Sequence, residues 1–459
     1  MKISTMKTRP ESLLALGLAL LFVASPHLTA ATPPPGTKQR FTDWARRMKS
    51  DLKDRVFPYW YDTAVDRTNG GYLLADSTTG RETPRDKMLV SQARMLWGFS
   101  HAHIKGLHDP QRDYLAAAKQ GYEFIRNHFH DTANGGYFMA TDPAGNPIDR
   151  HKTLYAQSFV IYAFLEFHKA SADPRPRNDA YELFQLLQRK AHDGRHDGWF
   201  EHFEEDWTVI TEPYAGNYVI EVPGLKSANA HLHWMEALTE LYKAFNEPKV
   251  RQALAESIEI NQRYFYPKEP GKSAFHRHPD WRSVSAYSSL GLSYGHNVEF
   301  AWLMIEAQKA LGRTPSWEHF YAHIDHALQY GYDHERGGVY DRGFSDRPAT
   351  RTDKIWWVQA EMMAALTYAI RNHVRPEYGT ALEQLNQFVW SHMVDPRDAI
   401  WVDTVAADGS LVRGVKASNW KANYHDVRAM VRFYETFELG ENLLLTWPIP
   451  NRPGAAPTP

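Results

Sequence analysis

Asn69-Gly70-Gly71-Tyr72 is a glycine turn that leads into an aromatic residue, and this signature recurs along the chain. It returns clearly at Asn134-Gly135-Gly136-Tyr137, Asp197-Gly198-Trp199-Phe200 and Arg336-Gly337-Gly338-Val339-Tyr340, and more weakly at residues 271–275 and 398–401. Successive members begin 65, 63, 74, 65 and 62 residues apart. Such a period indicates a repeat architecture in which each unit packs on its neighbours.

Between the turns, apolar residues follow the i, i+3, i+4 spacing of helices that bury one face. Examples are Leu89, Ala93, Leu96 and Trp97; Leu232, Met235, Leu238 and Tyr242; Val298, Ala301, Trp302 and Ile305; and Trp357, Ala360, Ala364 and Thr367. A unit of this length holds two helices and a loop, whereas open solenoids usually repeat every ~20–50 residues. We predict an all-α fold, an (α/α)6 barrel of six helical hairpins with short β-strands in the loops at one mouth. An irregular all-α protein is the alternative.

The N-terminus has the layout of a secretory signal. Lys2, Lys7 and Arg9 precede an apolar run at residues 13–24, and small residues follow at 29–31. The run is shorter than the ~20 residues that span a bilayer. We expect a signal peptide at 1–31, a Pro-rich linker at 32–37, the barrel at 38–447 and a flexible Pro-rich tail at 448–459. The protein would then be exported, periplasmic or secreted, without stable membrane insertion after cleavage; an uncleaved anchor is the alternative.

The composition excludes several classes of function. The chain has 459 residues, with 52 Lys and Arg against 54 Asp and Glu, and it shows no basic footprint for nucleic acid. The absence of cysteine removes disulfides, thiolate metal sites and a cysteine nucleophile. The 15 Trp and 24 Tyr offer flat faces that suit sugars, although most aromatic residues fill cores. Oligomeric state does not follow from these numbers.

Several predicted helices carry polar side chains on faces that are otherwise apolar. A buried guanidinium such as that of Arg94 is costly unless it meets an anion or several acceptors. Residues three or four apart share a helix face. The remaining groups of this kind are Asn229 with His233, His296 with Glu299 and Trp302, Trp357 with Glu361, and Trp420 with His425. Because these groups come from different repeats, a closed ring would bring them into one central polar pocket.

Other site types find little support. The His-x-His pairs at 101/103, 128/130 and 231/233 would point to different sides of a helix and so chelate a metal poorly. The pair at 276/278 would share a face on a strand, so it stays a weak candidate for a metal site. No His-Glu-x-x-His pattern or glycine-rich phosphate loop occurs. Gly291-Leu292-Ser293-Tyr294-Gly295 matches a hydrolase elbow, but a helical repeat surrounds it instead of the required parallel sheet. We expect no metal and no cofactor.

Two histidines in one pocket suit proton transfer at carbon. His296 and His425 could face a substrate from opposite sides, one removing a proton beside a carbonyl and the other returning it. The C2 proton of an open-chain aldose is of this kind, and its removal leaves an enediolate that Arg94 could stabilise. Glu299 could hold and polarise His296, while Trp357 and Trp420 could stack on sugar rings.

Four segments together resemble the N-acylglucosamine 2-epimerase superfamily, with the greatest likeness to cellobiose 2-epimerases, over residues 57–435. They are residues 229–233 (NAHLH), 293–299 (SYGHNVE), 354–361 (KIWWVQAE) and 420–425 (WKANYH). The resemblance implies an (α/α)6 barrel that epimerises or isomerises sugars at C2 without a metal or nucleotide cofactor. It maps the acid/base histidines onto His296 and His425, and the enediolate-supporting arginine onto Arg94. It maps the sugar-contacting residues onto Asn229, His233, Glu299, Trp302, Trp357, Glu361 and Trp420.

The sequence departs from cellobiose 2-epimerases at Asn297, usually Asp, and at Asn423, usually Pro. Neither change removes a catalytic group, but both bear on disaccharide recognition. The leading hypothesis is a cofactor-free 2-epimerase acting on the reducing end of a cellobiose-like sugar, with His233 as a further group for ring opening.

The alternatives are a mannose–fructose isomerase, an N-acylglucosamine 2-epimerase, a glycan-binding protein and an inverting glycoside hydrolase. A hydrolase would need two carboxylates, for which five residues are available without a specific pattern: Glu201, Glu204, Asp206, Asp341 and Glu361.

Overall fold

The computed structural model describes residues 37–74, 86–215, 222–284, 292–344, 346–372 and 375–438. The predicted signal peptide, nearly all of the linker and the Pro-rich tail lie outside the described residues. The helices are α1 Thr37–Asp51, α2 Phe57–Ala64, α3 Leu89–Ile104, α4 Tyr114–Phe124, α5 Leu154–Ser171, α6 Pro174–Lys190, α7 Ala228–Phe245, α8 Pro248–Ile260, α9 Tyr294–Ala310, α10 Trp317–Tyr330, α11 Trp356–Asn372, α12 Pro376–His392 and α13 His425–Phe437. In this part of the chain, none of the helices has the length and apolar character needed to cross a bilayer.

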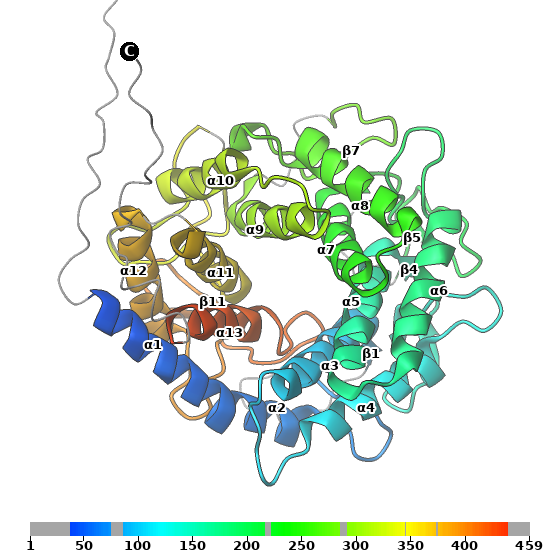
Figure 1. Cartoon of the computed structure of the whole chain (residues 1–459), viewed down its shortest axis with the longest axis horizontal. Helices are drawn as coiled ribbons and strands as arrows, with labels where there is room; N and C mark the ends of the chain where they lie inside the picture. The colour runs from blue at the N-terminus through cyan, green and yellow to red at the C-terminus, as the bar shows by residue number, and fades with distance from the viewer. Residues whose placement is uncertain are drawn as a thin grey trace, which may run out of the picture.

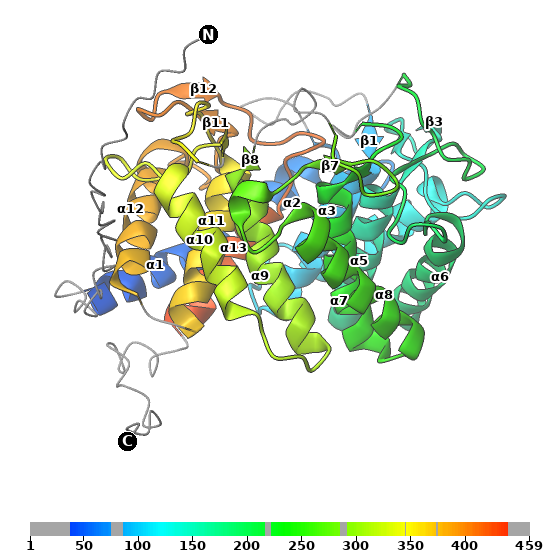
Figure 2. The same cartoon turned by 90° about the horizontal axis from the view of Figure 1, so that it is seen from above.

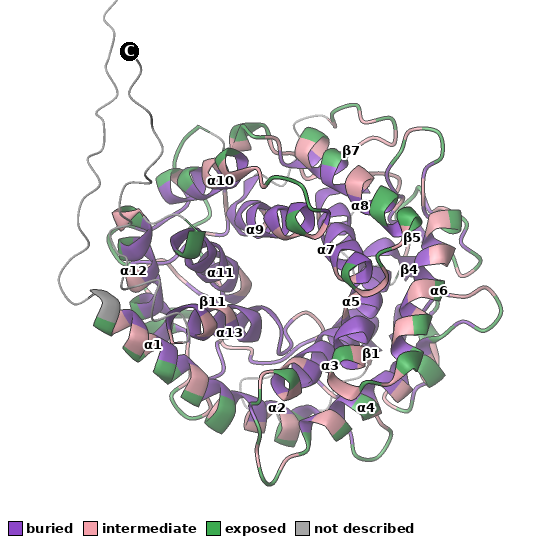
Figure 3. Cartoon of the chain, in the orientation of Figure 1, coloured by how far each residue is buried: buried purple, intermediate pink, exposed green. Residues whose placement is uncertain are grey.

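The helices form two concentric rings (Figure 1). The inner ring holds α3, α5, α7, α9, α11 and α13, and each of these helices packs on the next in that order. The outer ring holds α1 with α2, then α4, α6, α8, α10 and α12. Inner helices are buried on nearly all sides, whereas outer helices expose one face (Figure 3). The prediction of an (α/α)6 barrel of six helical hairpins is confirmed.

Short strands gather at one mouth of the barrel (Figure 2). They are β1 Lys87–Met88, β2 Ala140–Thr141, β3 Pro147–Asp149, β4 Lys152–Thr153, β5 His202–Phe203, β6 Lys226–Ser227, β7 His276–Arg277, β8 Leu292–Ser293, β9 Arg342–Gly343, β10 Lys354–Ile355, β11 Thr404–Val405 and β12 Leu411–Arg413. All pair antiparallel, in the orders β1-β2-β3, β4-β5, β6-β7, β8-β9 and β10-β11-β12. In five repeats a strand runs directly into an inner helix, so the first turns of these helices open at this mouth.

In five of the six repeats a buried lysine is bonded to the glycine turn, and in four of them this lysine stands two residues before the inner helix. Lys354, for example, donates to Asp333 at 2.8 Å and to the carbonyl of Gly337 at 2.7 Å. The other lysine–aspartate pairs are Lys87–Asp66, Lys152–Asp131, Lys226–Asp193 and Lys416–Asp395. A buried lysine needs such a partner because an unpaired charge is costly away from water.

A glutamine one turn into the inner helix completes this fastening. Gln92 accepts from the Tyr72 N–H and donates to the Tyr72 carbonyl, both at 2.8 Å. Gln157 and Gln359 make the same pair of bonds. In the third repeat His231 stands at this position, and its Nε2 accepts from the Trp199 N–H at 3.2 Å. His231 therefore has a structural task that its neighbour His233 does not share.

Candidate active site

His296 lies in the first turn of α9, at the mouth where the strands gather. Ser293 caps the helix, and its Oγ lies 2.8 Å from His296 Nδ1. The imidazole packs between two aromatic rings, with centroids 5.3 Å from Phe275 and 4.7 Å from Trp357. Burial, reinforced by the nearby Arg342 guanidinium, lowers the pKa of His296 well below its usual value. The side chain is therefore neutral at neutral pH and can accept a proton.

His425 begins α13 and also packs against Trp357, with ring centroids 5.9 Å apart. Its Nδ1 is 2.6 Å from Glu361 Oε1. An ionised carboxylate only accepts hydrogen bonds, so Nδ1 carries the hydrogen and Nε2 is left as a base. Burial lowers the pKa of His425 to about 3, against the opposing effect of Glu361. The closed ring of hairpins thus brings two neutral imidazoles against one tryptophan.

His233 repeats this arrangement on α7. Its Nδ1 is 2.9 Å from Glu236 Oε2, and its ring packs on Tyr155 and Phe159, with centroid distances of 5.2 and 4.8 Å. Burial lowers the pKa of His233, while Glu236 opposes the shift. His233 is therefore a third neutral imidazole in the site. Like His425, and unlike His296, it has its Nδ1 bonded to a carboxylate.

One guanidinium joins the carboxylates of three inner helices. Arg428 donates to Glu236 at 2.5 Å, to Glu299 at 2.9 Å and to Glu361 at 2.7 Å. Tyr424 donates its hydroxyl hydrogen to Glu236 at 3.0 Å. Arg428 and Glu236 are functional residues that the sequence analysis missed, although each stands three residues after a site histidine and so shares its helix face.

The three carboxylates differ in charge. Burial alone would raise the pKa of Glu236, but Arg428 and His233 hold it at about 2. Burial would likewise raise the pKa of Glu361, yet Arg428 and His425 hold it well below its usual value. Burial and the charge of Glu361 raise the pKa of Glu299 well above its usual value. Glu299 is therefore a neutral acid beside two ionised neighbours.

The expected pairing of Glu299 with His296 is not found. His296 Nδ1 lies against Ser293, and the Glu299 oxygen Oε1 accepts from Arg428. The two residues do lie three apart on α9, as predicted, but the closure of the ring gives Glu299 a partner on α13. The carboxylates that orient site histidines are Glu361, bonded to His425, and Glu236, bonded to His233.

Arg94 lies on α3, and its guanidinium packs against aromatic rings. It donates to the Tyr155 hydroxyl at 2.8 Å and to the Trp420 carbonyl at 3.1 Å, and its guanidinium lies 4.4 Å from the Phe159 ring centroid. Among the described residues no carboxylate forms an ion pair with Arg94, and its Nε–H has no hydrogen-bond partner. A buried cation in this state is suited to an anion that develops on a substrate.

The remaining predicted residues divide into two groups. Trp302 and Glu361 are buried and bonded to each other, at 3.1 Å between Nε1 and Oε2. They support His425 from within the wall, and their predicted contact with a sugar stays a prediction. Asn229, Trp357 and Trp420 are only partly buried, as aromatic and amide groups that meet a substrate would be.

A possible metal cluster within the site lies against the Arg428 guanidinium. Glu299, Glu361 and His425 bring ligand atoms within 4.8 Å of one another. Arg428 already donates to both carboxylates, and a cation placed there would meet its positive charge. The cluster therefore forms a charge network that holds His425.

The family model described as N-acylglucosamine 2-epimerase (GlcNAc 2-epimerase) matches residues 70–429, which include every predicted site residue. The chain belongs to the N-acylglucosamine 2-epimerase family. It is accordingly an enzyme that epimerises or isomerises carbohydrates.

Relatives of this epimerase match it over most of their length. Cellobiose 2-epimerase of Bacteroides fragilis is 29% identical over 396 residues, 84% of this chain and 97% of the relative. D-mannose isomerase of Marinomonas mediterranea is 24% identical over 404 residues, 84% of this chain and 96% of the relative. The structure of cellobiose 2-epimerase from Spirochaeta thermophila superimposes with a TM-score of 0.78 at 29% identity, covering 89% of this chain and all of that one.

Proposed function

We propose that the protein is a cofactor-free sugar 2-epimerase that acts on the reducing-end aldose of a cellobiose-like disaccharide. The observation that carries this proposal is the pair of neutral imidazoles, His296 and His425, that both pack against Trp357, with ring centroids 4.7 and 5.9 Å from it. A base on each side of one carbon is what inversion at that carbon requires. The cellobiose 2-epimerases among the relatives support the disaccharide as substrate.

The reaction starts from the open-chain aldose. One histidine takes the proton from C2, and the electron pair moves onto the carbonyl to form an enediolate. Arg94 donates to the developing oxyanion, because its positive charge has no carboxylate partner among the described residues. The second histidine, which takes up a proton from solvent before this step, returns it to the opposite face of C2. The product is the 2-epimer, and the two histidines have exchanged roles.

Ring opening needs an acid and a base at O1 and O5. His233 is suited to this step because Glu236 holds its Nδ1 and leaves Nε2 available. The relation of Glu361 to His425 matches that of Glu236 to His233, so one arginine governs both histidines through their carboxylates.

The test is proton NMR of the mature protein with cellobiose, mannose, glucose and N-acetylglucosamine in D₂O. Deuterium at C2, with the signals of the 2-epimer, supports the proposal and names the substrate. The variants His296→Asn and His425→Asn should each stop epimerisation, while each still exchanges the C2 proton of only one of the two epimers. Epimerisation that survives His425→Asn at an unchanged rate would show that the mechanism is wrong.

Isomerisation is the second candidate, favoured by the mannose isomerases among the relatives. It uses the same enediolate but returns the proton to C1, so a keto sugar would appear instead of the 2-epimer. Hydrolysis is less well supported, because Glu361, the hydrolase candidate that contacts a predicted catalytic histidine, is already bonded to Arg428, His425 and Trp302.

We also propose that the protein is exported, on the basis of the N-terminal layout described above. Mass determination of the protein purified from its own cells tests this. A chain that begins near residue 32 supports export, and an intact Met1 contradicts it.

A further inference from the structure

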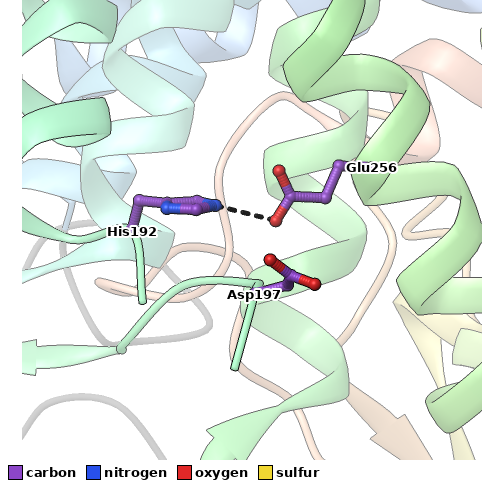
Figure 4. Close-up of side chains that lie close together, drawn as sticks. All are labelled: His192, Asp197 and Glu256. Carbon is purple, nitrogen blue, oxygen red and sulfur yellow. Dashed lines mark hydrogen bonds and ion pairs between the residues drawn. The ribbon is translucent and has the colours of Figure 1, made fainter. Parts of the chain in front are cut away.

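A second group of metal-ligating side chains lies in the outer wall, where the turn after α6 meets α8. It consists of His192, Asp197 and Glu256, each of which places one ligand atom within 4.8 Å of the others. The His192 ring points at Glu256, with Nε2 2.8 Å from Oε1, and the Asp197 carboxylate lies beside the pair (Figure 4). None of these residues belongs to the predicted catalytic or sugar-binding set.

The internal repeat provides a comparison for this group. In five repeats the turn closes with the N–H of one residue donating to the carbonyl of an aspartate four positions earlier, and that residue has a positive φ. The residue is Gly70, Gly135, Gly337 or Ala399 in the other four turns, and Asp197, with φ 63°, in the third. A left-handed backbone favours glycine and, after it, Asn and Asp, so Asp197 fits this turn and adds a carboxylate that the other four turns lack at this position.

Glu256 also differs from the residue at the corresponding position of the first repeat. Its Oε1 accepts from the Gly198 N–H at 2.8 Å, which ties α8 to the turn. In the first repeat the uncharged Gln120 ties α4 to the corresponding turn, by donating to the Asp66 carbonyl. A neutral amide therefore suffices for the structural task, and the third repeat uses an acid instead.

The group holds two carboxylates that no Lys or Arg of the described chain meets in a side-chain ion pair; the partner of Glu256 is His192 itself. Lys226, on β6, acts on both carboxylates only at longer range, because its amine is bonded to Asp193 and to the Asp197 carbonyl. One imidazole and two carboxylates in contact form a ligand set of the kind that Zn²⁺ takes in proteins.

We propose that His192, Asp197 and Glu256 bind a divalent transition-metal ion, with Zn²⁺ as the preferred ion, that clamps the turn after α6 to α8. Zn²⁺ bonds of about 2.0–2.2 Å require ligand atoms about 3.4 Å apart, and the exposed Asp197 side chain can rotate to close the remaining gap. The imidazole ligand selects against Ca²⁺ and Mg²⁺, which take oxygen ligands. The ion stabilises the fold and takes no part in the chemistry at C2.

Two substitutions remove ligands without removing anything that the turn needs. Asp197→Gly installs the residue of three sister turns, and Glu256→Gln installs the amide of the first. We expect isothermal titration of the chelator-treated, untagged protein with Zn²⁺ to show one site in the parent. Binding should be at least about tenfold weaker in each variant, because loss of even an outer-shell partner costs that much. Zn²⁺ should raise the unfolding temperature of the parent more than that of either variant.

His130 provides the matched control, because it stands at the place of His192 in the second repeat, whose turn carries Gly135. His130→Ala should leave Zn²⁺ binding unchanged. Zn²⁺ that binds Asp197→Gly as tightly as the parent occupies another site, such as the catalytic histidines, and overturns the proposal; inhibition of C2 exchange would reveal that site. Absence of a Zn²⁺ site in the parent overturns it equally, as does equal binding of Ca²⁺ or Mg²⁺.

Discussion

Replacement of Glu361 by glutamine tests how strongly His425 depends on its carboxylate. When His425 takes the C2 proton it becomes an imidazolium 2.6 Å from Glu361 Oε1, in a fully buried setting. Unit charges about 4 Å apart at an effective dielectric constant of about 20 attract by about 4 kcal/mol. Arg428 donates to the same oxygen and offsets part of this attraction, so we expect a loss of about 2–4 kcal/mol. At 1.36 kcal/mol per decade, kcat/KM should fall by about 30- to 1,000-fold.

The assay is the rate of deuterium entry at C2 of the substrate in D₂O. Glu166→Gln is the matched control, because Glu166 holds His101 Nδ1 at the same distance of 2.6 Å but lies outside the site. The control should lose stability without losing exchange. If Glu361→Gln retains exchange within about threefold of the control, Glu361 does not support an imidazolium at His425 and the mechanistic reasoning fails.

Three further predictions follow from single residues. Arg94→Met should lower kcat about 10²–10³-fold with a smaller change in KM, as loss of one oxyanion donor does, and steady-state kinetics beside Arg94→Lys measures this. Lys354→Met leaves the buried Asp333 carboxylate without its cation, so the free energy of unfolding should fall by about 3–5 kcal/mol in urea titrations. Burial lowers the pKa of His231 to about 3, so below pH 6.5 the unfolded chain binds a proton at this residue and the folded chain does not. The free energy of unfolding therefore decreases as the pH is lowered, by at most about 1.36 kcal/mol per pH unit. His231→Gln, which restores the glutamine of the sister repeats, should remove about 1–2 kcal/mol of the loss between pH 6.5 and 5, and an unchanged pH dependence would contradict the assignment.

The period of the glycine turns was enough to predict the hairpin count, because five of the six turns contain a residue with positive φ and the chain repeats that requirement at regular intervals. The weak member at residues 271–275 overlaps a 3-10 helix at Pro270–Lys272, and none of its residues has a positive φ. A further signal was present but missed: an aspartate at the start of the turn and a lysine 21 residues later in four repeats, as in Asp66 with Lys87. The lysine is charged, and a charge at the start of an apolar helix gives no indication in the sequence that it is buried and paired.

The candidate site could be predicted in part for a similar reason. Arg94, His296 and His425 are polar residues on apolar helices, and helical spacing alone assigns them to buried faces. Glu236 and Arg428 follow the same spacing, yet they were missed because a glutamate or arginine at i+3 from a histidine is common on exposed helices. Their burial depends on which face of the helix the neighbouring hairpin covers.

The sequence by itself thus determined the repeat, the helical class and the family, and it predicts the two histidines of the site. Only the tertiary structure decided which side chain is hydrogen-bonded to which histidine. Glu361 is bonded to His425 and Ser293 to His296, whereas Glu299 accepts from Arg428. Spacing along one helix shows which side chains share a face, because that depends on local geometry. Partners on different helices depend on how far each helix slides and rotates when the ring closes, and that is set by the packing of the whole core.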